Sequence, residues 1–558
     1  MLSTSPSLRL KTTLLLAFLI TSCLVTLGFR SAQAADDPLI PEIPRQDLPI
    51  INDGRVSSVA QIGNLAVIGG TFTSITLRDG TVIPQAKLVA FDLDTGELAA
   101  GFMHTLDGDV DVVRAAEDGS AVFIGGTFKK IDGQWHIRVA RLNPDGSLAA
   151  GFNASASAQV LALQEHAGRL FLGGSFESVN NIPRSRLAAI DALTGALDAD
   201  FDLPLTSPAG PGGSGSVKSL DLNVDGRTLL VAHNSLYVAG ESRTGVALID
   251  IATNSVLPWQ TDWYLQSRLN CAGARLAIRD AEFSPDGSRF VVVEKGGGRC
   301  DKSIAWPTAD GPGLEENLWV TQMFDSVLAV GAADNAFYVG GHFCYVRAMG
   351  AIPFTRVLED PGVAKPTACS NKVVDVGDIK ARYQIAALDP NTGAPLDWNP
   401  TTTSVIGSYD IEITPRGMLH GMDGDRVAWI NTGRFSFHDL GTPTPPAPPL
   451  DTPPVVSIEA PASDATVSGR FRISGMAFDD VAMSHVELAV RNRDTKQWVQ
   501  PDLSLGQWTL LSTALTDHTW ESSDLSLPNG RYKIHVRAID QAGNTSDGWV
   551  TRNIIVSN

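Results

Sequence analysis

The sequence carries a short apolar stretch that recurs along the chain and ends each time in two glycines. It reads VFIGGTF at residues 122–128, and close variants occur at 67–72, 171–176 and 338–343. Its β-branched and aromatic residues favour extended strands. A glycine pair at a strand end indicates that another backbone passes very close, or that φ is positive. The pattern therefore predicts one β-strand in each of several repeated units.

The repeats share a fixed order of four short elements. An apolar strand precedes the glycine-paired strand, a third apolar strand follows, and a Thr-Gly or Asp-Gly turn leads into a closing aromatic residue. In the first three units this residue is Phe102, Phe152 or Phe201, and a period of about fifty residues with four strands is typical of a propeller blade. Seven units fit between residues 50 and 441. In the irregular fourth unit, residues 236–240 are the expected second strand.

The pattern changes after a proline-rich segment at residues 442–454, which we interpret as a semi-rigid linker. Residues 455–558 alternate apolar and polar positions with period two between turns, which predicts a β-sandwich. With a lead at residues 35–49, the expected chain is all-β: a seven-bladed β-propeller followed by an immunoglobulin-like β-sandwich.

The N-terminus has the pattern of an export signal. Arg9 and Lys11 precede an apolar run over residues 14–29, and the small residues up to Ala34 form a cleavage site. Residues 1–34 are therefore expected to be removed. The mature chain would be secreted or held at the cell surface, without a transmembrane segment. An uncleaved anchor is the other interpretation, although the run is short for a span.

The cysteines add a second possibility and a set of disulfides. Cys23 lies in a lipobox-like sequence, so lipid anchoring at this residue is an alternative to secretion. An even number of cysteines in an exported chain predicts disulfides. Pairing of nearest neighbours is our choice among three connectivities. The predicted pairs are Cys271 with Cys300 and Cys344 with Cys369.

The charge excludes one class of partner. The formal net charge is −18 and no basic stripe occurs along the chain. Such a protein repels a phosphate backbone, so we do not expect it to bind nucleic acid.

The repeated words resemble a known group of proteins. Val/Leu-x-x-Gly-Gly-Thr/Ser-Phe, Leu-Ala-x-Leu-Asp and Thr-Gly-x-Leu are similar to the delta-sixty-repeat, kelch-like propellers of secreted bacterial proteins, over roughly residues 50–440. Residues 455–558 resemble a bacterial immunoglobulin-like or fibronectin-III-like module, notably at 538–544. The resemblance implies the fold and an extracellular location. It implies no agreed activity, and such modules usually space or attach extracellular proteins.

The residue that follows each second strand is expected to lie at the mouth of one propeller face. Side chains there either bond to neighbouring backbone or form a polar cluster. In the second case Glu241 or Asp423 would act as a base, His342 as an acid or metal ligand, and Lys295 as a clamp for an anion. The predicted positions are Thr71, Thr127, Ser175, Glu241, Lys295, His342 and Asp423.

Two further segments are candidates for ligand binding. An insertion of about forty residues follows His342, and long loops without regular structure are often functional, so Tyr345 and Arg347 are expected on a binding surface. Trp135 and His136 fall in a loop of the second unit, where the indole would stack on a sugar ring or cover a neighbouring blade.

No cofactor is expected, apart from a structural calcium ion. Asp479, Asp480, Asp540 and Asn544 have suitable oxygen ligands but no EF-hand spacing, so ordinary turn roles are the favoured interpretation and calcium binding is the alternative.

The expected function is binding or adhesion outside the cell, to an extracellular polymer or a cell-surface ligand, with carbohydrate as one candidate. The alternative is a lyase or hydrolase that acts on extracellular polysaccharide with the same face. Convergence of Glu241, His342 and Tyr345 in one pocket would favour the enzyme.

Overall fold

The computed structural model describes most of the chain after residue 37. Nearly all of the regular structure in this part is β, as predicted, and the one short 3₁₀ turn with assigned bounds is η1 (Ala100–Phe102). The described residues are 38–208, 215–265, 277–295, 301–309, 311, 313–352, 374–441, 453–479, 483–516, 518–541, 544–546 and 548–558.

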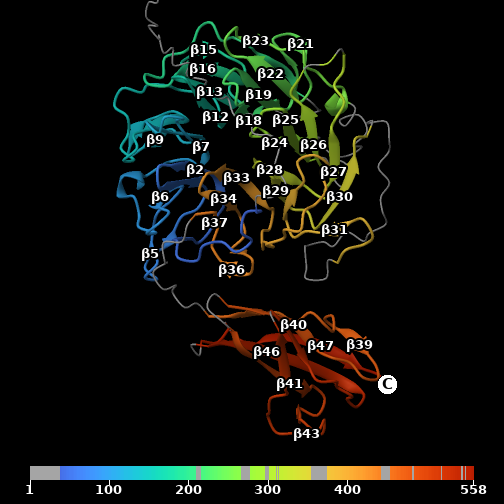
Figure 1. The fold of residues 1–558 in the computed structure, drawn as a ribbon. Helices are drawn as coiled ribbons and strands as arrows, with labels where there is room; N and C mark the ends of the chain where they lie inside the picture. Colours follow the sequence, from blue (N-terminus) through green and yellow to red (C-terminus); the bar gives the residue numbers. More distant parts are fainter. Residues whose placement is uncertain are drawn as a thin grey trace, which may run out of the picture. The chain divides into compact units, whose positions relative to one another are not determined.

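Seven antiparallel sheets succeed one another within the described residues 56–439. The first strand of each sheet contacts the first strand of the next, and the last of the seven contacts the first, so the sheets form a closed ring (Figure 1). This is the propeller arrangement that the repeats predicted. The inner strands are β2 (Val56–Ile62), β7 (Val110–Ala115), β12 (Val160–His166), β18 (Val217–Leu222), β24 (Ala277–Phe283), β28 (Val327–Ala332) and β33 (Ser408–Thr414).

Each inner strand pairs with a second strand, which pairs with a third. The second strands are β3 (Leu65–Gly70), β8 (Val122–Gly126), β13 (Arg169–Gly174), β19 (Thr228–His233), β25 (Arg289–Lys295), β29 (Phe337–Gly341) and β34 (Gly417–Met422). The third strands are β6 (Leu88–Asp92), β11 (Val139–Leu142), β16 (Leu187–Asp191), β22 (Val246–Asp250), β26 (Lys302–Pro307), β32 (Ile385–Leu388) and β37 (Phe435–Asp439).

The fourth strand is shorter than the repeats suggested. It is an assigned strand in the fourth and fifth sheets, as β23 (Ser255–Val256) and β27 (Trp319–Gln322). In four other sheets it is reduced to one bridge after the Thr-Gly or Asp-Gly turn. These bridges join Phe91 to Leu98, Leu142 to Leu148, Ile190 to Leu197 and Leu388 to Pro395.

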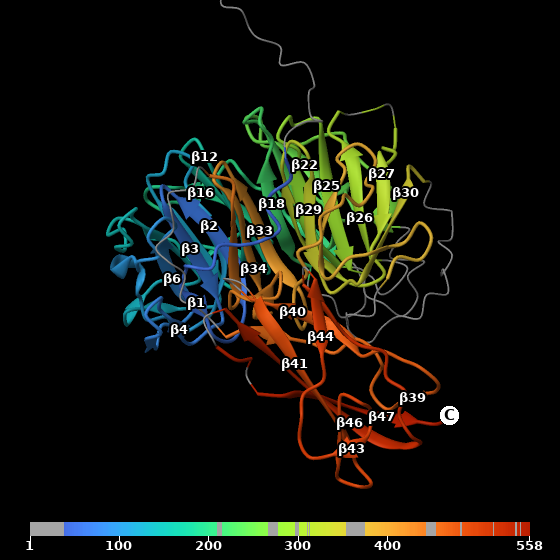
Figure 2. The same ribbon diagram turned by 60° about the horizontal axis from the view of Figure 1, so that its bottom comes forward.

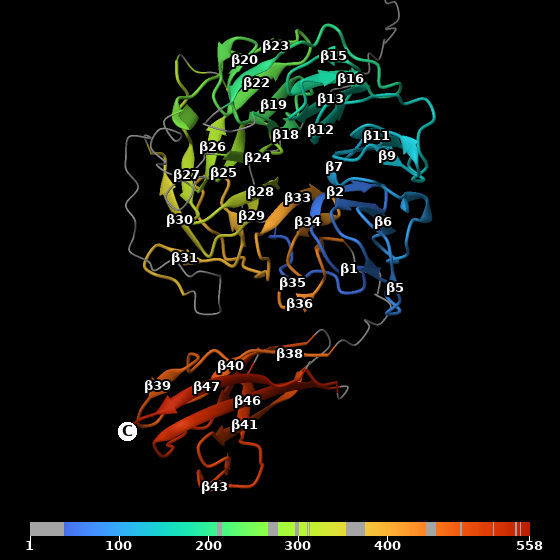
Figure 3. The same cartoon turned by 180° about the vertical axis from the view of Figure 1, so that it is seen from behind.

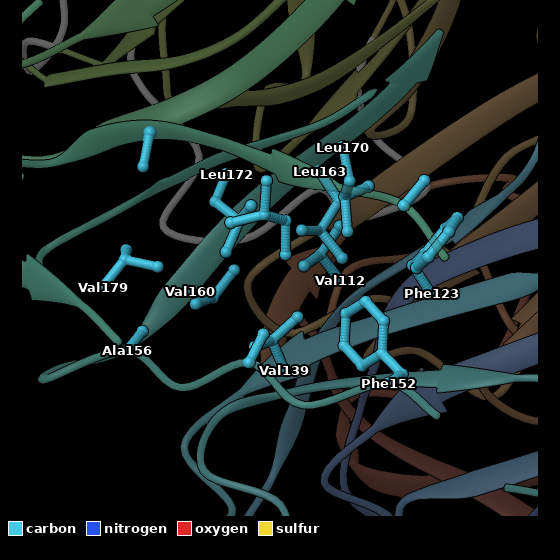
Figure 4. Close-up of a cluster of buried hydrophobic side chains, with 14 of the residues drawn as sticks. Val112, Phe123, Val139, Phe152, Ala156, Val160, Leu163, Leu170, Leu172 and Val179 are labelled. Carbon is cyan, nitrogen blue, oxygen red and sulfur yellow. The ribbon is translucent and has the colours of Figure 1, made fainter. Parts of the chain in front are cut away.

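The glycine pairs are required by close approach of neighbouring strands rather than by positive φ. A Cβ on Gly125 would lie 2.7 Å from Cγ1 of Val160 in the next sheet, and a Cβ on Gly126 would overlap the carbonyl oxygen of Asp109. Adjacent sheets can therefore pack closely around a shared apolar core. Figure 4 shows the core between the second and third sheets, where Phe123 and Leu172 are buried.

The predicted second strand of the fourth unit is wrong. β19 takes that place, while residues 236–240 fall largely in β20 (Ser235–Val238), which pairs with β17 (Leu205–Pro208) and β21 (Glu241–Ser242). The sequence misled because β19 lacks a glycine pair, and His233 occupies the position of the second glycine. Residues 236–240 do form an apolar run ending in glycine.

Short hairpins connect second to third strands, where loops were expected. In the sixth sheet the corresponding strands are β30 (Tyr345–Gly350) and β31 (Lys380–Ala381). Strand β30 also pairs with β27 of the fifth sheet, so the start of the insertion extends that neighbouring sheet. The other hairpins are β4 (Ile75–Thr76) with β5 (Val82–Ile83), β9 (Lys130–Ile131) with β10 (Gln134–Trp135), β14 (Ser178–Val179) with β15 (Ile182–Pro183), β20 with β21, and β35 (Arg426–Val427) with β36 (Ile430–Asn431).

The N-terminal lead packs on the last two sheets of the propeller. The indole of Trp398 donates to the carbonyl of Ile40 at 2.7 Å, and the amide of Ile40 donates to the hydroxyl of Tyr338 at 2.9 Å. Strand β1 (Ile50–Ile51) pairs with β4, and Ile51 also bridges Gly433 beside β36 (Figure 3). The lead therefore connects the beginning of the ring to its end.

The C-terminal region is a sandwich of two sheets (Figure 2). Its core contains Leu488, Trp520 and Tyr532, as an immunoglobulin-like sandwich requires. One sheet contains β38 (Val455–Val456), β40 (Ser474–Phe478), β45 (Thr519–Ser522) and β44 (Thr513–Thr516). The other contains β39 (Ala465–Val467), β47 (Val550–Val556), β46 (Gly530–Asp540), β41 (Met483–Asn492), β42 (Trp498–Val499) and β43 (Leu505–Gly506).

Among the described residues of the chain, no helix is both long and apolar enough to span a membrane.

Candidate functional site

All seven inner strands line one central cavity of about 130 Å³. In every sheet, the pairing between the inner and the second strand shifts register after the first or second residue of the inner strand. The shift leaves one residue of the inner strand unpaired, as in a β-bulge. These unpaired residues, which we call the bulge ring, all line the cavity. The ring consists of Ser57, Asp111, Leu161, Lys218, Arg279, Leu328 and Tyr409.

The bulge ring is polar on most strands and includes one acid. Asp111 accepts a hydrogen bond from the side-chain Nε2 of Gln159 at 2.7 Å and lies 3.9 Å from the guanidinium of Arg55. Burial raises the pKa of Asp111. The guanidinium of Arg55 also lies over the ring of Tyr409, 5.0 Å from its centroid. The acid of the ring is thus already engaged by neighbouring donors.

A second charged group lies farther along the inner strands. Arg114 is 3.7 Å from Glu412 and 3.9 Å from Asp221, and its guanidinium also bonds to Gln164. Burial, followed by the charges of Asp221 and Glu412, raises the pKa of Glu282. One arginine therefore compensates several crowded carboxyl groups.

Several polar side chains of the inner strands bond to the backbone of a neighbouring blade. Asp410 accepts from the amide of Val59 at 2.8 Å, and Asp280 accepts from the amide of Val330 at 3.0 Å. Burial raises the pKa of Asp280 to about 7 and that of Asp410 to about 6. Such values suit acid–base catalysis near neutral pH, but these carboxyl groups are already used to join blades.

The predicted catalytic residues have separate local partners. Glu241 pairs with Arg243 at 2.8 Å on the exposed strand β21. Asp423 accepts hydrogen bonds from consecutive backbone amides of residues 405–407. His342 lies 3.3 Å from Asp325. In the part of the chain that the structure describes, no hydrogen bond joins Glu241, His342 and Tyr345.

Glu241 does not occupy the position that the repeat assigned to it. The amide of Thr71 donates to Arg55, that of Thr127 to Asp109 and that of His342 to Ser326. In the fourth sheet the matching bond comes from Asn234. The prediction for Glu241 followed from the wrong second strand, and Asn234 is the equivalent residue.

The start of the insertion is less open than a binding loop would be. Tyr345 is only 9 % exposed and packs in a small cluster with Ile379 and Ala381. Arg347 binds Asp378 at 2.8 Å. Lys295, at the end of β25, does occupy its predicted position, opposite Ala277 and one residue beyond Glu294.

The predicted aromatic platform lies on the hairpin of β9 and β10. Trp135 is 67 % exposed, and the ammonium group of Lys130 lies 4.6 Å from the centroid of its ring. Burial and the neighbouring His104 lower the pKa of His136. His104 in turn bonds to Asp132 at 2.6 Å. The hairpin therefore carries an exposed indole beside polar, titratable groups.

The disulfide and calcium predictions fall partly outside the described residues. Cys344 is disulfide-bonded, but Cys271, Cys300 and Cys369 are not described, so the pairing stays a prediction. In the sandwich, Asp540 accepts a hydrogen bond from the amide of Asn544 at 2.8 Å, which is a turn role. The described residues contain no group of three or more metal-ligating side chains with suitable geometry. Asp479 is described, Asp480 is not, and calcium stays a prediction.

Sequence reasoning missed the central cavity. The available signal was a charged residue at the second or third position of a first strand, as with Asp111, Lys218 and Arg279. A period-two pattern assigns such residues to one face of a strand. The register shift that directs them into the cavity is not visible in that pattern.

Comparisons with solved structures give distant similarities. The designed protein Ika8 matches at 14 % identity over 71 % of this chain and all of its own, with a TM-score of 0.38. A chain of the mitotic checkpoint complex matches at 11 % over 73 % of this chain and 98 % of its own (TM-score 0.40). The extracellular domain of BT3049 from B. thetaiotaomicron matches at 11 %, over 91 % of this chain and 56 % of its own (TM-score 0.34).

Two family matches agree with the architecture. No curated protein matches the sequence. Residues 122–152 match the family described as a domain of unknown function (DUF5122) beta-propeller, and residues 454–536 match the bacterial Ig domain family. The chain therefore combines a propeller with a bacterial Ig domain.

Proposed function

We propose that the protein is a non-catalytic binding protein that acts outside the cell and recognises carbohydrate through the hairpin of β9 and β10. The observation that carries this proposal is the exposure of Trp135, which leaves most of a large aromatic surface open to solvent. An indole offers a flat apolar face for a sugar ring, and the ammonium group of Lys130 lies over one face of Trp135, so a sugar would stack on the other. The bacterial Ig domain supports a spacer or attachment role for the second region.

Two observations favour binding over catalysis. Glu241, Asp423 and His342 are each engaged by their own neighbours. Asp280 and Asp410, whose pKa values burial raises towards neutrality, already accept backbone hydrogen bonds that join neighbouring blades.

The proposal is tested with the mature full-length chain on a glycan array. The wild type is expected to bind a subset of glycans, and Trp135→Ala to lose about tenfold in affinity, since aromatic contacts of this kind contribute about 1 kcal/mol or more. Trp508→Ala is the matched control, because Trp508 is 53 % exposed in the sandwich.

The same preparation is incubated with a panel of polysaccharides to detect turnover. Turnover that Glu241→Gln or His342→Gln abolishes would favour the enzyme. Equal glycan binding by wild type and Trp135→Ala would exclude the proposed surface.

A further inference from the structure

Two cations lie next to each other in the bulge ring, and the described residues form no ion pair with either of them. Lys218 and Arg279 belong to the neighbouring inner strands β18 and β24, and both line the central cavity. Among the described residues, neither side chain forms an ion pair or a hydrogen bond, and Nε of Arg279 is buried without a partner. Burial, then the charge of Arg279, lowers the pKa of Lys218 to about 8. Burial lowers the pKa of Arg279 as well.

This arrangement costs free energy unless an anion offsets it. Burying a charge is unfavourable without a partner, and two like charges side by side add to the cost. The charge of Asp111 acts on Lys218 but offsets the two cations only in part, because Asp111 also accepts a hydrogen bond from the side chain of Gln159 and lies 3.9 Å from Arg55. The chain has a net charge of −18, so two adjacent cations that form no ion pair stand out against an excess of acidic residues.

The two side chains have the chemistry of an oxyanion site. A guanidinium presents parallel N–H donors that match two oxygens of a carboxylate, sulfate or phosphate, and a lysine adds a compact charge. The hydroxyl groups of Ser57 and Tyr409 are further possible donors in the same ring. The cavity, of about 130 Å³, has room for one such group.

We propose that Lys218 and Arg279 form a binding site for a compact oxyanion in the central cavity of the propeller, taken either as a free ion or as the acidic group of a larger ligand. This site is distinct from Trp135 and does not depend on the carbohydrate-binding proposal.

The first test is calorimetric titration of the full chain at pH 7 and low ionic strength. The probes are sodium sulfate, sodium glucuronate and, as a neutral control, glucose. Saturable binding of sulfate is expected, with at least a tenfold loss of affinity in Lys218→Met and Arg279→Gln. Arg227→Gln is the matched control, because it removes an exposed arginine that is paired with Asp250 outside the cavity.

A second test uses pH and keeps the proposal testable if Arg279→Gln fails to fold. Lys218 is charged below pH 8 and loses its proton above it, so sulfate affinity is expected to fall by up to tenfold per unit as pH rises from 8 to 9.5. Lys218→Arg is expected to retain binding over this range. Burial raises the pKa of Tyr409 and of the carboxyl groups that line the same cavity, which are Asp111, Asp221, Asp280, Glu282, Asp410 and Glu412. Lys218→Arg leaves all of these groups unchanged, so the difference between this variant and the wild type isolates the titration of Lys218.

Each outcome decides for or against the site. Binding of sulfate alone supports a free-ion site, and binding of glucuronate as well supports recognition of an acidic group on a larger ligand. The proposal is overturned if the wild type binds neither anion saturably, or if both cavity variants bind as the wild type does. The cavity variants leave Trp135 unchanged, and Trp135→Ala leaves the cavity unchanged, so the two proposals fail separately.

Discussion

At the scale of single residues, the glycine pairs show how one position can determine how closely neighbouring strands approach. Gly126 lies on β8 with its Cα facing the carbonyl of Asp109, so even a methyl group has no room. The neighbour is backbone within a paired strand and cannot move aside as a side chain could. The sequence left two explanations open, close approach of another backbone or positive φ, and the structure shows the close approach.

Gly126→Ala is therefore expected to lower the free energy of unfolding of the propeller by about 2–3 kcal/mol. Gly151→Ala in the same unit is the control: no atom lies within 4 Å of the added methyl group, so its effect should stay within about 0.5 kcal/mol. Denaturant titrations of both variants measure the difference. Equal stability of the two would show that the strands can separate without cost.

Two buried histidines in the seventh sheet form a hydrogen-bond chain with a definite direction. Nδ1 of His438 lies 2.8 Å from the carbonyl of Pro41, which can only accept, so Nδ1 carries the proton. Ser436 lies between His438 and His420, and His420 in turn reaches Ser408 at 2.7 Å. Burial lowers the pKa of His420 to about 3 and that of His438 to about 4.

These shifts predict a loss of stability in acid. Above pH 6.5 both histidines are neutral in the folded and unfolded chains. As pH falls from 6.5 towards 4, the unfolded chain takes up protons that the folded chain does not, which costs about 1.4 kcal/mol per pH unit for each histidine. His438→Gln should therefore gain stability relative to the wild type by about this slope between pH 6 and 4.5. Unfolding titrations at several pH values measure it, and a pH-independent difference would contradict the assignment.

At the scale of elements, regular units were predictable and irregular ones were not. β3, β8, β13 and β29 end in the glycine pair that identified them. β19 has no such pair, and its fully buried residues show no alternation, so an adjacent apolar run was mistaken for it. The insertion after His342 was expected to be a loop, yet β30 adds to the edge of another sheet, a pairing that depends on a distant partner.

Of the candidate sites, one could also be found from the sequence and the other could not. The exposed Trp135 could be found from the sequence because a large aromatic residue in a polar segment is conspicuous. Lys218 and Arg279 could not be brought together, because they lie in different blades and only closure of the ring makes them neighbours.

The N-terminal lead is an element whose importance the sequence understated. Tyr338→Phe removes the acceptor for the amide of Ile40 and should lower the free energy of unfolding by about 1–2 kcal/mol, since that buried donor is left without a partner. Tyr237→Phe is the control, because Tyr237 is 39 % exposed on β20. Denaturant titration distinguishes the two, and an unchanged midpoint for Tyr338→Phe would show that the lead adds little stability.

At the scale of the whole molecule, propeller and sandwich have separate cores. The apolar cluster around Leu488 contains only residues between Val456 and Val556, and the cluster around Leu172 contains only residues of the second and third sheets. Two independent unfolding transitions are therefore expected in calorimetry.

Reciprocal substitutions assign the two transitions. Leu488→Ala should cost about 2–5 kcal/mol and lower the transition of the sandwich alone, whereas Leu172→Ala should lower that of the propeller alone. A single transition that both variants shift equally would show that the two regions unfold as one unit.

The bond between Pro41 and His438 joins positions 397 residues apart, and so relates the structure to the order of synthesis. The segment made first completes the sheet made last. Because the chain emerges from its N-terminus, Pro41 is available long before His438, its partner in this hydrogen bond. Until Asp439 has emerged, the ring stays open with unpaired strand edges, so a nascent chain of this design needs protection from self-association in the interval.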